Sequence, residues 1–128
     1  MTLPPRLQRE IDGLKELSWN IEISEDSDYI NLVLINFSLE EGYSEPVSDL
    51  LLRVPRCYPD AGPDMFWVDP KILLDTGQIP QSAENIEIHL EKKWRRFSWH
   101  RQGSSWNPII DNIHSYVEFI HRRLREKK

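Results

Sequence analysis

The chain has 128 residues, of which 39% are hydrophobic and 10% aromatic, and its formal net charge is −5. This composition is typical of a single globular domain that is large enough to bury a core, and it excludes an intrinsically disordered chain. No stretch approaches the roughly 18 apolar residues of a membrane span, and the N-terminus has no signal-peptide core, so we expect a cytoplasmic protein that does not enter a membrane.

The N-terminal half predicts a helix followed by four strands. Pro4 and Pro5 favour a helix start, and apolar residues then recur every three or four positions. This stripe consists of Leu7, Ile11, Leu14 and Leu17. Apolar or alternating runs predict strands over residues 19–23, 29–39, 50–54 and 65–68. Short polar turns separate these strands, which favours an antiparallel meander.

The C-terminal half predicts a long loop region and a second helix. Residues 69–85 are expected to form the loop, 86–90 a short strand, and 92–105 irregular chain. Asn107 and Pro108 supply a helix cap and a favoured first position. The buried stripe of this helix is expected from Ile109, Ile113, Tyr116, Val117, Ile120 and Leu124. We therefore predict one α+β domain over residues 1–128, with its helices against one sheet face.

Charge and cysteine usage restrict the chemistry further. The segment from Lys92 to Lys128 holds ten Lys or Arg against three Asp or Glu, whereas the rest of the chain is acidic. Such polarity can orient a charged partner, but an acidic chain without a glycine–aromatic motif is not typical of nucleic-acid binding, and we expect none. A single cysteine excludes an internal disulfide and disfavours a zinc centre, so no metal site is predicted.

A proline-rich loop between two predicted strands carries the most specific motif. Residues 58–67 read Tyr-Pro-Asp-Ala-Gly-Pro-Asp-Met-Phe-Trp, and proline excludes a helix here. Further motifs follow at Asp69-Pro70-Lys71, Gly77, Phe97-Ser98-Trp99-His100 and Trp106-Asn107-Pro108. Together they resemble the ubiquitin-conjugating enzyme (UBC) superfamily, and in particular its bacterial branch known as prokaryotic family E.

This resemblance implies a fold and a partner system. The implied fold is UBC-like, with an N-terminal helix, a four-stranded antiparallel meander, a long loop region and a C-terminal helix. The implied partners are a ubiquitin-like protein and its activating enzyme. The resemblance implies no small-molecule cofactor, because ATP would belong to the activating enzyme.

Two departures from the superfamily pattern concern catalysis. Where conjugating enzymes carry His-Pro-Asn, this chain has Asp69-Pro70-Lys71, and the Asn amide is the group that stabilises the oxyanion. The usual Gly-x-Ile-Cys stretch, which ends in the nucleophile, reads Gly77-Gln78-Ile79-Pro80. Thioester exchange needs a thiolate. Proline has none, so the usual catalytic position lacks a nucleophile.

Three other side chains are candidates for the missing chemistry. Cys57 is the only thiol, and Arg56 beside it would raise its thiolate fraction; the alternative is a plain loop cysteine. Ser82 could carry an oxyester only with a base to activate it, and is otherwise a solvated loop serine. His100 is either a general acid or base near neutral pH or a structural histidine that holds the loop.

A basic aromatic segment is the candidate for partner binding. Trp94 and Trp99, together with Arg95 and Arg96, combine the residue types that dominate interface energetics. The alternative is that these aromatic side chains pack the long irregular segment.

The sequence thus predicts a UBC-like component of a bacterial conjugation system that binds the ubiquitin-like protein, its activating enzyme, or both. Two alternatives stay open: an active transferase that uses Cys57 or a loop hydroxyl, and a noncatalytic adaptor of the related RWD type. These three share a similar scaffold, so the fold alone does not separate them.

Overall fold

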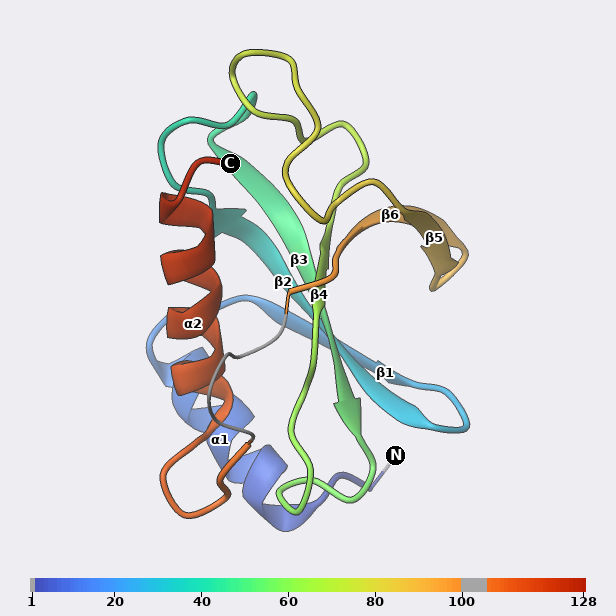
Figure 1. Cartoon of the computed structure of the whole chain (residues 1–128). Coiled ribbons are helices and arrows are strands. Elements are labelled where there is room, and N and C mark those ends of the chain that lie inside the picture. The colour runs from blue at the N-terminus through green and yellow to red at the C-terminus, as the bar shows by residue number, and fades with distance from the viewer. Residues whose placement is uncertain (1, 100–105) are drawn as a thin grey trace.

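The computed structural model describes residues 2–99 and 106–128. Within them, helices α1 (Pro5–Glu16) and α2 (Ile113–Arg125) lie against one face of a six-stranded antiparallel sheet (Figure 1). The strand order is β1-β2-β3-β4-β6-β5. The strands are β1 (Ile21–Glu25), β2 (Tyr29–Ser38), β3 (Val47–Pro55), β4 (Phe66–Val68), β5 (Ile86–His89) and β6 (Lys92–Phe97). The predicted α+β class is confirmed. The sheet has six strands, two more than the predicted four-stranded meander.

The additional strand β6 lies in the segment that the sequence predicted to be irregular. Its Trp94, Arg95 and Phe97 are buried, and two consecutive arginines hide the apolar alternation of a strand. The turn before it, Leu90–Glu91, has positive φ at both residues. Such two-residue hairpin turns are normally recognised by Asn or Gly, so this turn leaves no signal in the sequence.

The main core lies between the two helices and the inner face of the sheet. Leu7, Ile11 and Leu14 of α1 are buried as the stripe predicted, but Leu17 follows the helix and is 65% exposed. The α2 stripe is also confirmed from Ile113 onward. The sheet contributes to this core Ile30, Leu32, Leu34, Leu50, Leu52, Val54, Phe66, Val68 and Phe97.

The last helix begins at Ile113 rather than at Pro108. Asn112 caps it, accepting the Ser115 N–H while the Ser115 hydroxyl accepts the Asn112 N–H, a reciprocal capping box. Asn107 instead organises a turn, in which its side chain accepts the Ile109 N–H at 3.0 Å. Ile109 is therefore 90% exposed, and its predicted place in the buried stripe was wrong.

One carboxylate joins α1, the proline-rich loop and the start of α2. Glu10 accepts hydrogen bonds from the Tyr58 hydroxyl, from the Ile113 N–H at 2.9 Å and from Arg6 at 2.7 Å. Arg6 also donates to the carbonyls of Pro108 and Asp111. Burial, and then the hydrogen bond and charge of Glu10, raise the pKa of Tyr58, which keeps the phenol protonated as a donor.

The proline-rich loop is fixed on the other side by Trp106. The Trp106 indole donates to the Pro59 carbonyl at 2.7 Å, and its ring lies 5.5 Å from the Tyr58 ring. Gly62 lies so close to the indole that a Cβ there would come within 2.1 Å of it. Tyr58, Gly62 and Trp106 therefore form one packed unit.

We expect Glu10→Ala to lower the free energy of unfolding by about 2–4 kcal/mol, because it leaves a buried phenol and a helix N–H without their charged acceptor. Urea unfolding followed by tryptophan fluorescence measures this. The exposed Glu16→Ala in the same helix is the control and should change stability by less than about 0.5 kcal/mol. Equal effects of the two changes would contradict a joining role for Glu10.

Gly62→Ala should destabilise the protein by about 1–3 kcal/mol, because the added methyl group overlaps the Trp106 ring. Gly13 provides the matched control, since it lies within α1 and a Cβ there meets nothing within 4 Å. Gly13→Ala should therefore stabilise by about 0.5–1 kcal/mol through helix propensity. Thermal unfolding of both variants would show shifts of opposite sign; a shift of the same sign would contradict the Gly62–Trp106 packing.

Candidate functional site

The loop between β4 and β5 contains the stretch that matches the superfamily's catalytic segment. Within it, residues 74–78 form a tight turn, with the Leu74 N–H donating to the Gln78 carbonyl at 2.9 Å and Gly77 at φ +88°. The loop docks on the β2–β3 connection, where the Asp75 N–H donates to the Gly42 carbonyl at 2.9 Å. The catalytic segment is thus an ordered surface loop at one end of the sheet.

The position of the superfamily's nucleophile is occupied by a buried residue. Pro80, which stands where the cysteine is usual, is buried, and its carbonyl accepts the Ala83 N–H at 3.1 Å. The neighbouring Gln78 and Ile79 are exposed. Proline offers neither a nucleophile nor a proton, so this position has a packing role in the described structure.

The Asp69-Pro70-Lys71 stretch also differs in its chemistry from His-Pro-Asn. The Asp69 carboxylate accepts the Lys71 N–H at 3.0 Å, and the Asp69 N–H donates to the Ser48 hydroxyl at 3.0 Å. The Lys71 ammonium lies 3.9 Å from Glu45 on the β2–β3 connection. These residues therefore build a turn and an exposed ion pair rather than an amide donor aimed at a reacting carbonyl.

Arg95 holds the two ends of the β4–β5 loop together. Its guanidinium donates to the Pro70 carbonyl at 3.2 and 2.8 Å and to the Ala83 carbonyl at 2.7 Å. The side chain is only 8% exposed, and burial lowers the pKa of Arg95 against the opposing charge of Glu84. Its predicted role in partner binding does not fit this placement, because each of its three guanidinium nitrogens donates to a backbone carbonyl inside the protein.

Arg123 of α2 is a second arginine that binds loop carbonyls, and the sequence did not single it out. It donates to the Gln81 and Lys128 carbonyls at 2.8 and 2.7 Å. Its guanidinium carbon lies 4.5 Å from the Trp99 ring centre and 5.3 Å from that of Phe97, so aromatic faces cover a cation that is 1% exposed. Arg123 follows Ile120 by three residues, which places it on the buried stripe of α2. This spacing is the sequence feature from which its burial could have been predicted.

Trp94 and Trp99 are both packing residues in the described structure. Trp94 is 1% exposed and donates its indole N–H to the His89 carbonyl at 2.9 Å. It packs with Leu51 and Trp67 in a second cluster on the sheet face away from the helices. Trp99 is half-buried against the main core, beneath Arg123. The alternative of an exposed tryptophan anchor is therefore wrong for Trp94.

Arg96 belongs to a polar cluster around Glu87 that sequence reasoning missed. Glu87 accepts from Arg96 at 2.6 Å and from the Trp67 indole at 2.9 Å, and it contacts His89 at 3.0 Å. Burial opposes the negative charge, but the hydrogen bonds from His89 and Trp67 and the charge of Arg96 together lower the pKa of Glu87. The alternation along the strand predicts that Glu87 and His89 share one face of it. The sequence does not predict that Trp67, which belongs to β4, contacts Glu87.

Cys57 lies far from the β4–β5 loop. It is exposed in the β3–β4 loop, two residues after β3 ends at Pro55, whereas Asp69 is bonded to Ser48 near the start of β3. The seven residue steps from Ser48 to Pro55 span about 23 Å of strand. Arg56 donates to the carbonyls of Ser27 and Asp26, so its guanidinium is committed to the β1–β2 turn.

Of the other two candidates for catalysis, Ser82 gains no catalytic partner among the described residues. Ser82 has a positive φ of 64°, and its carbonyl accepts the Ser98 N–H at 2.9 Å. In the part of the chain that the structure describes, its hydroxyl has no histidine or carboxylate partner. His100 lies outside the described residues.

Across the described ranges, no three His, Cys, Asp or Glu side chains form a candidate metal site, and no helix is long and apolar enough to span a membrane.

We expect Arg95→Lys to loosen the β4–β5 loop, because one ammonium group cannot bind two carbonyls on opposite ends of it. Limited trypsin digestion reports this at Lys71, inside the loop, and cleavage there should be at least about threefold faster. The neighbouring Arg96→Lys is the matched control, because the Arg96 side chain bonds to Glu87 and Ser98 and not to that loop. Unchanged cleavage in Arg95→Lys would contradict the clamp.

Comparison with known protein families identifies the family of this chain. The sequence profile described as prokaryotic E2 family E matches residues 7–127. No curated protein and no solved structure matches the chain. Since the profile spans nearly the whole chain, the protein belongs to prokaryotic E2 family E.

Proposed function

We propose that this protein is a component of a ubiquitin-like conjugation system that binds the ubiquitin-like protein, its activating enzyme, or both, without forming a thioester at the usual position. The observation that carries this proposal is the buried Pro80 in place of the nucleophile. Family membership supports the partner system, and the missing thiol argues against the usual chemistry.

The chemistry of transfer supports a noncovalent role. Accepting an activated carboxyl group from a thioester requires a nucleophile that is also a competent leaving group, and a thiolate satisfies both demands. The β4–β5 loop contains no cysteine. Its Ser82 hydroxyl has no base among the described residues, and a serine without a base is a poor acceptor.

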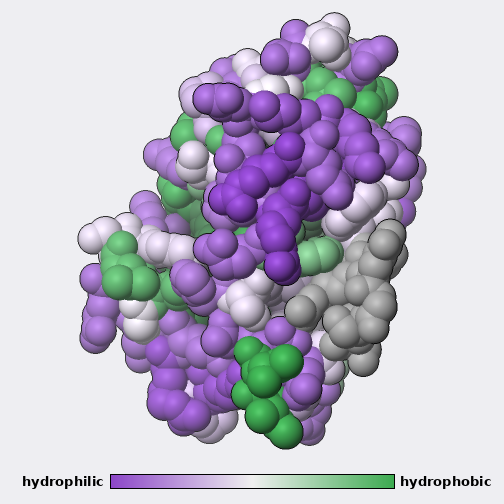
Figure 2. Space-filling view, turned by 60° about the vertical axis from the view of Figure 1, so that its left-hand side comes forward, coloured by the Kyte–Doolittle hydropathy of each residue, from purple (hydrophilic) through white to green (hydrophobic). Residues whose placement is uncertain are grey.

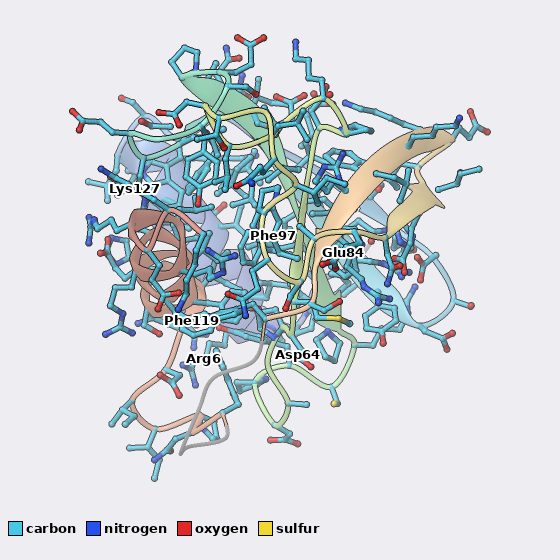
Figure 3. All side chains as sticks on the ribbon, turned by 45° about the horizontal axis from the view of Figure 1, so that its top comes forward. Arg6, Asp64, Glu84, Phe97, Phe119 and Lys127 are labelled. Atoms are coloured by element: carbon cyan, nitrogen blue, oxygen red, sulfur yellow. The ribbon has the colours of Figure 1, made fainter. Side chains whose placement is uncertain are left out.

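An exposed apolar pair offers a surface for such binding. Ile109 and Ile110 are 90% and 71% exposed on the turn before α2. Arg6 fixes this turn through its bonds to the Pro108 and Asp111 carbonyls, and Figure 3 shows Arg6 beside it. In Figure 2 an apolar patch lies below α2 on a largely hydrophilic face, where Figure 1 places this turn. Adjacent exposed isoleucines on a fixed turn are typical of an interaction site.

One observation favours a second candidate, an active transferase with a relocated nucleophile. Cys57 is exposed and free, so an incoming thioester can reach its sulfur. Against this candidate, Cys57 lies at the end of β3 opposite the family's catalytic loop. The two candidates differ in whether a covalent adduct forms.

Intact-mass spectrometry distinguishes them. The protein would be incubated with an activating enzyme and a ubiquitin-like protein from its own genome, and with ATP, and its mass measured before and after thiol treatment. We expect no adduct on this chain while the activating enzyme itself becomes charged. An adduct of one modifier that thiol removes, and that Cys57→Ala abolishes, would establish the transferase instead.

The same partners test the binding role directly. Ile109→Asp should weaken binding to whichever of the two partners the protein captures by about tenfold, because it places a charge in an apolar contact. Leu17→Asp is the control, the same kind of change at a side chain that is 65% exposed just after α1. Isothermal titration calorimetry measures both variants, and equal losses would contradict a site at the Ile109–Ile110 turn.

A further inference from the structure

The edge strand β5 is open along its outer side. It pairs with β6 alone and ends the sheet in the described structure. Ile86, Ile88 and Leu90 are 44%, 69% and 41% exposed along it. Long apolar edges are usually covered or blocked by charge, because they invite pairing with another strand. Figure 1 shows the β5–β6 hairpin curling away from the two helices, and Figure 3 shows Glu84 at its base.

The hydrogen-bond alternation of the hairpin shows which backbone groups are open. The Arg96 N–H donates to the Asn85 carbonyl at 2.9 Å. In an antiparallel pair, hydrogen-bonded and non-bonded positions alternate. The register pairs Ile86 with Arg95 and Ile88 with Lys93, which makes these two the non-bonded pairs. The N–H and C=O groups of Ile86 and Ile88 therefore point outward, away from β6.

A groove of about 760 Å³ runs beside this open edge on the sheet face away from the helices. All four β5 residues line it on one side, and Tyr29, Arg53 and Pro55 line it on the other. Between them lie Met65, Trp67 and Arg96, and Gly62 and Asp64 also line the groove. The groove therefore combines an open strand edge with an aromatic and charged lining, the two features of a site that binds an extended peptide.

The polar groups of the groove have unused donors rather than unused acceptors. Arg96 uses its Nε and Nη1 on Ser98 and Glu87, and Arg53 uses its Nε and Nη2 on Asn31 and Asp26. Among the described residues, Nη2 of Arg96 and Nη1 of Arg53 have no hydrogen-bond partner. The Glu87 carboxylate, in contrast, already has three partners. A peptide that brings a carboxylate between these two arginines would satisfy the remaining donors.

We propose that this groove binds an extended segment of a partner protein, which adds to β5 as a further antiparallel strand. Two apolar residues of that segment pair with Ile86 and Ile88 and cover their side chains. The residue between them faces the groove and carries a carboxylate directed at Arg53 and Arg96. This site lies on the face opposite the helices and does not depend on the proposed function.

The probe is the blocked peptide acetyl-Gly-Thr-Val-Glu-Val-Thr-Gly-amide, titrated to about 2 mM into the ¹⁵N-labelled protein, a range that detects millimolar affinity. We expect saturable shifts of the Ile86, Ile88 and Arg96 amides and of the Trp67 indole N–H. Methylating both valine amide nitrogens removes the strand hydrogen bonds and should weaken binding about tenfold or more. Replacing Glu by Gln should weaken it about threefold or more, because the arginines lose a charged acceptor.

Variants of the protein complete the test. Ile88→Lys, at a side chain that is 69% exposed, should weaken peptide binding about tenfold, whereas Ile109→Lys, on the distant turn, should leave it unchanged. No saturable shift at 2 mM, or equal affinity of the methylated peptide, would overturn the proposal. Sedimentation of the protein alone must also show a monomer; a dimer that Ile88→Lys dissociates would overturn the partner-peptide assignment in favour of a second copy of this chain.

Discussion

The structure depends first on the Glu10 carboxylate. Its bonds to Tyr58 and to the Ile113 N–H connect three segments that are far apart in the sequence: α1, the proline-rich loop and α2. A partly buried carboxylate stabilises such a junction only when each of its lone pairs meets a good donor, and here a phenol, a helix N–H and a guanidinium supply them. The direction of the Tyr58 pKa shift has the same cause, because a hydrogen bond to a carboxylate favours the protonated phenol. Trp106 closes the junction from the other side, and the turn with Ile109 and Ile110 is held at its edge.

The opposite end of the sheet is organised differently. There the β4–β5 loop is held by two buried arginines, Arg95 and Arg123, which donate to backbone carbonyls rather than to carboxylates. Arginine suits this task because its planar, forked donors can bind two carbonyls at once. A loop fixed in this way keeps its shape without the catalytic residues that the superfamily places on it. The chain belongs to an E2-like family, while Pro80, which stands at the position of the usual nucleophile, is buried.

The sequence predicted the elements whose signals are local. The α1 stripe, the first strands, the proline-rich loop and the missing thiol all follow from periodicity and motif. It failed where tertiary contacts override local signals. β6 carries Arg95 and Arg96 at positions that read as solvent-exposed, and its Leu90–Glu91 turn lacks the residues that such turns favour. The start of α2 was misplaced because Asn107 and Pro108 form a cap-like pattern, yet Asn112 has the capping partner. Glu87 could not be recognised as the centre of a cluster, because Trp67 reaches it from another strand.

The residues considered for catalysis and the residues considered for partner binding lie at different places in this protein. The only thiol and the buried Pro80 lie at opposite ends of β3, so a single bound partner contacts both only if it extends along the whole sheet. Exposed apolar side chains, in contrast, form two small and separate groups at the Ile109–Ile110 turn and at the β5 edge. The turn presents side chains alone, whereas the edge also presents backbone donors and acceptors that select an extended segment. Partners bound at these two proposed sites would be held at once without transfer between them, because the sites do not overlap and neither contains a nucleophile.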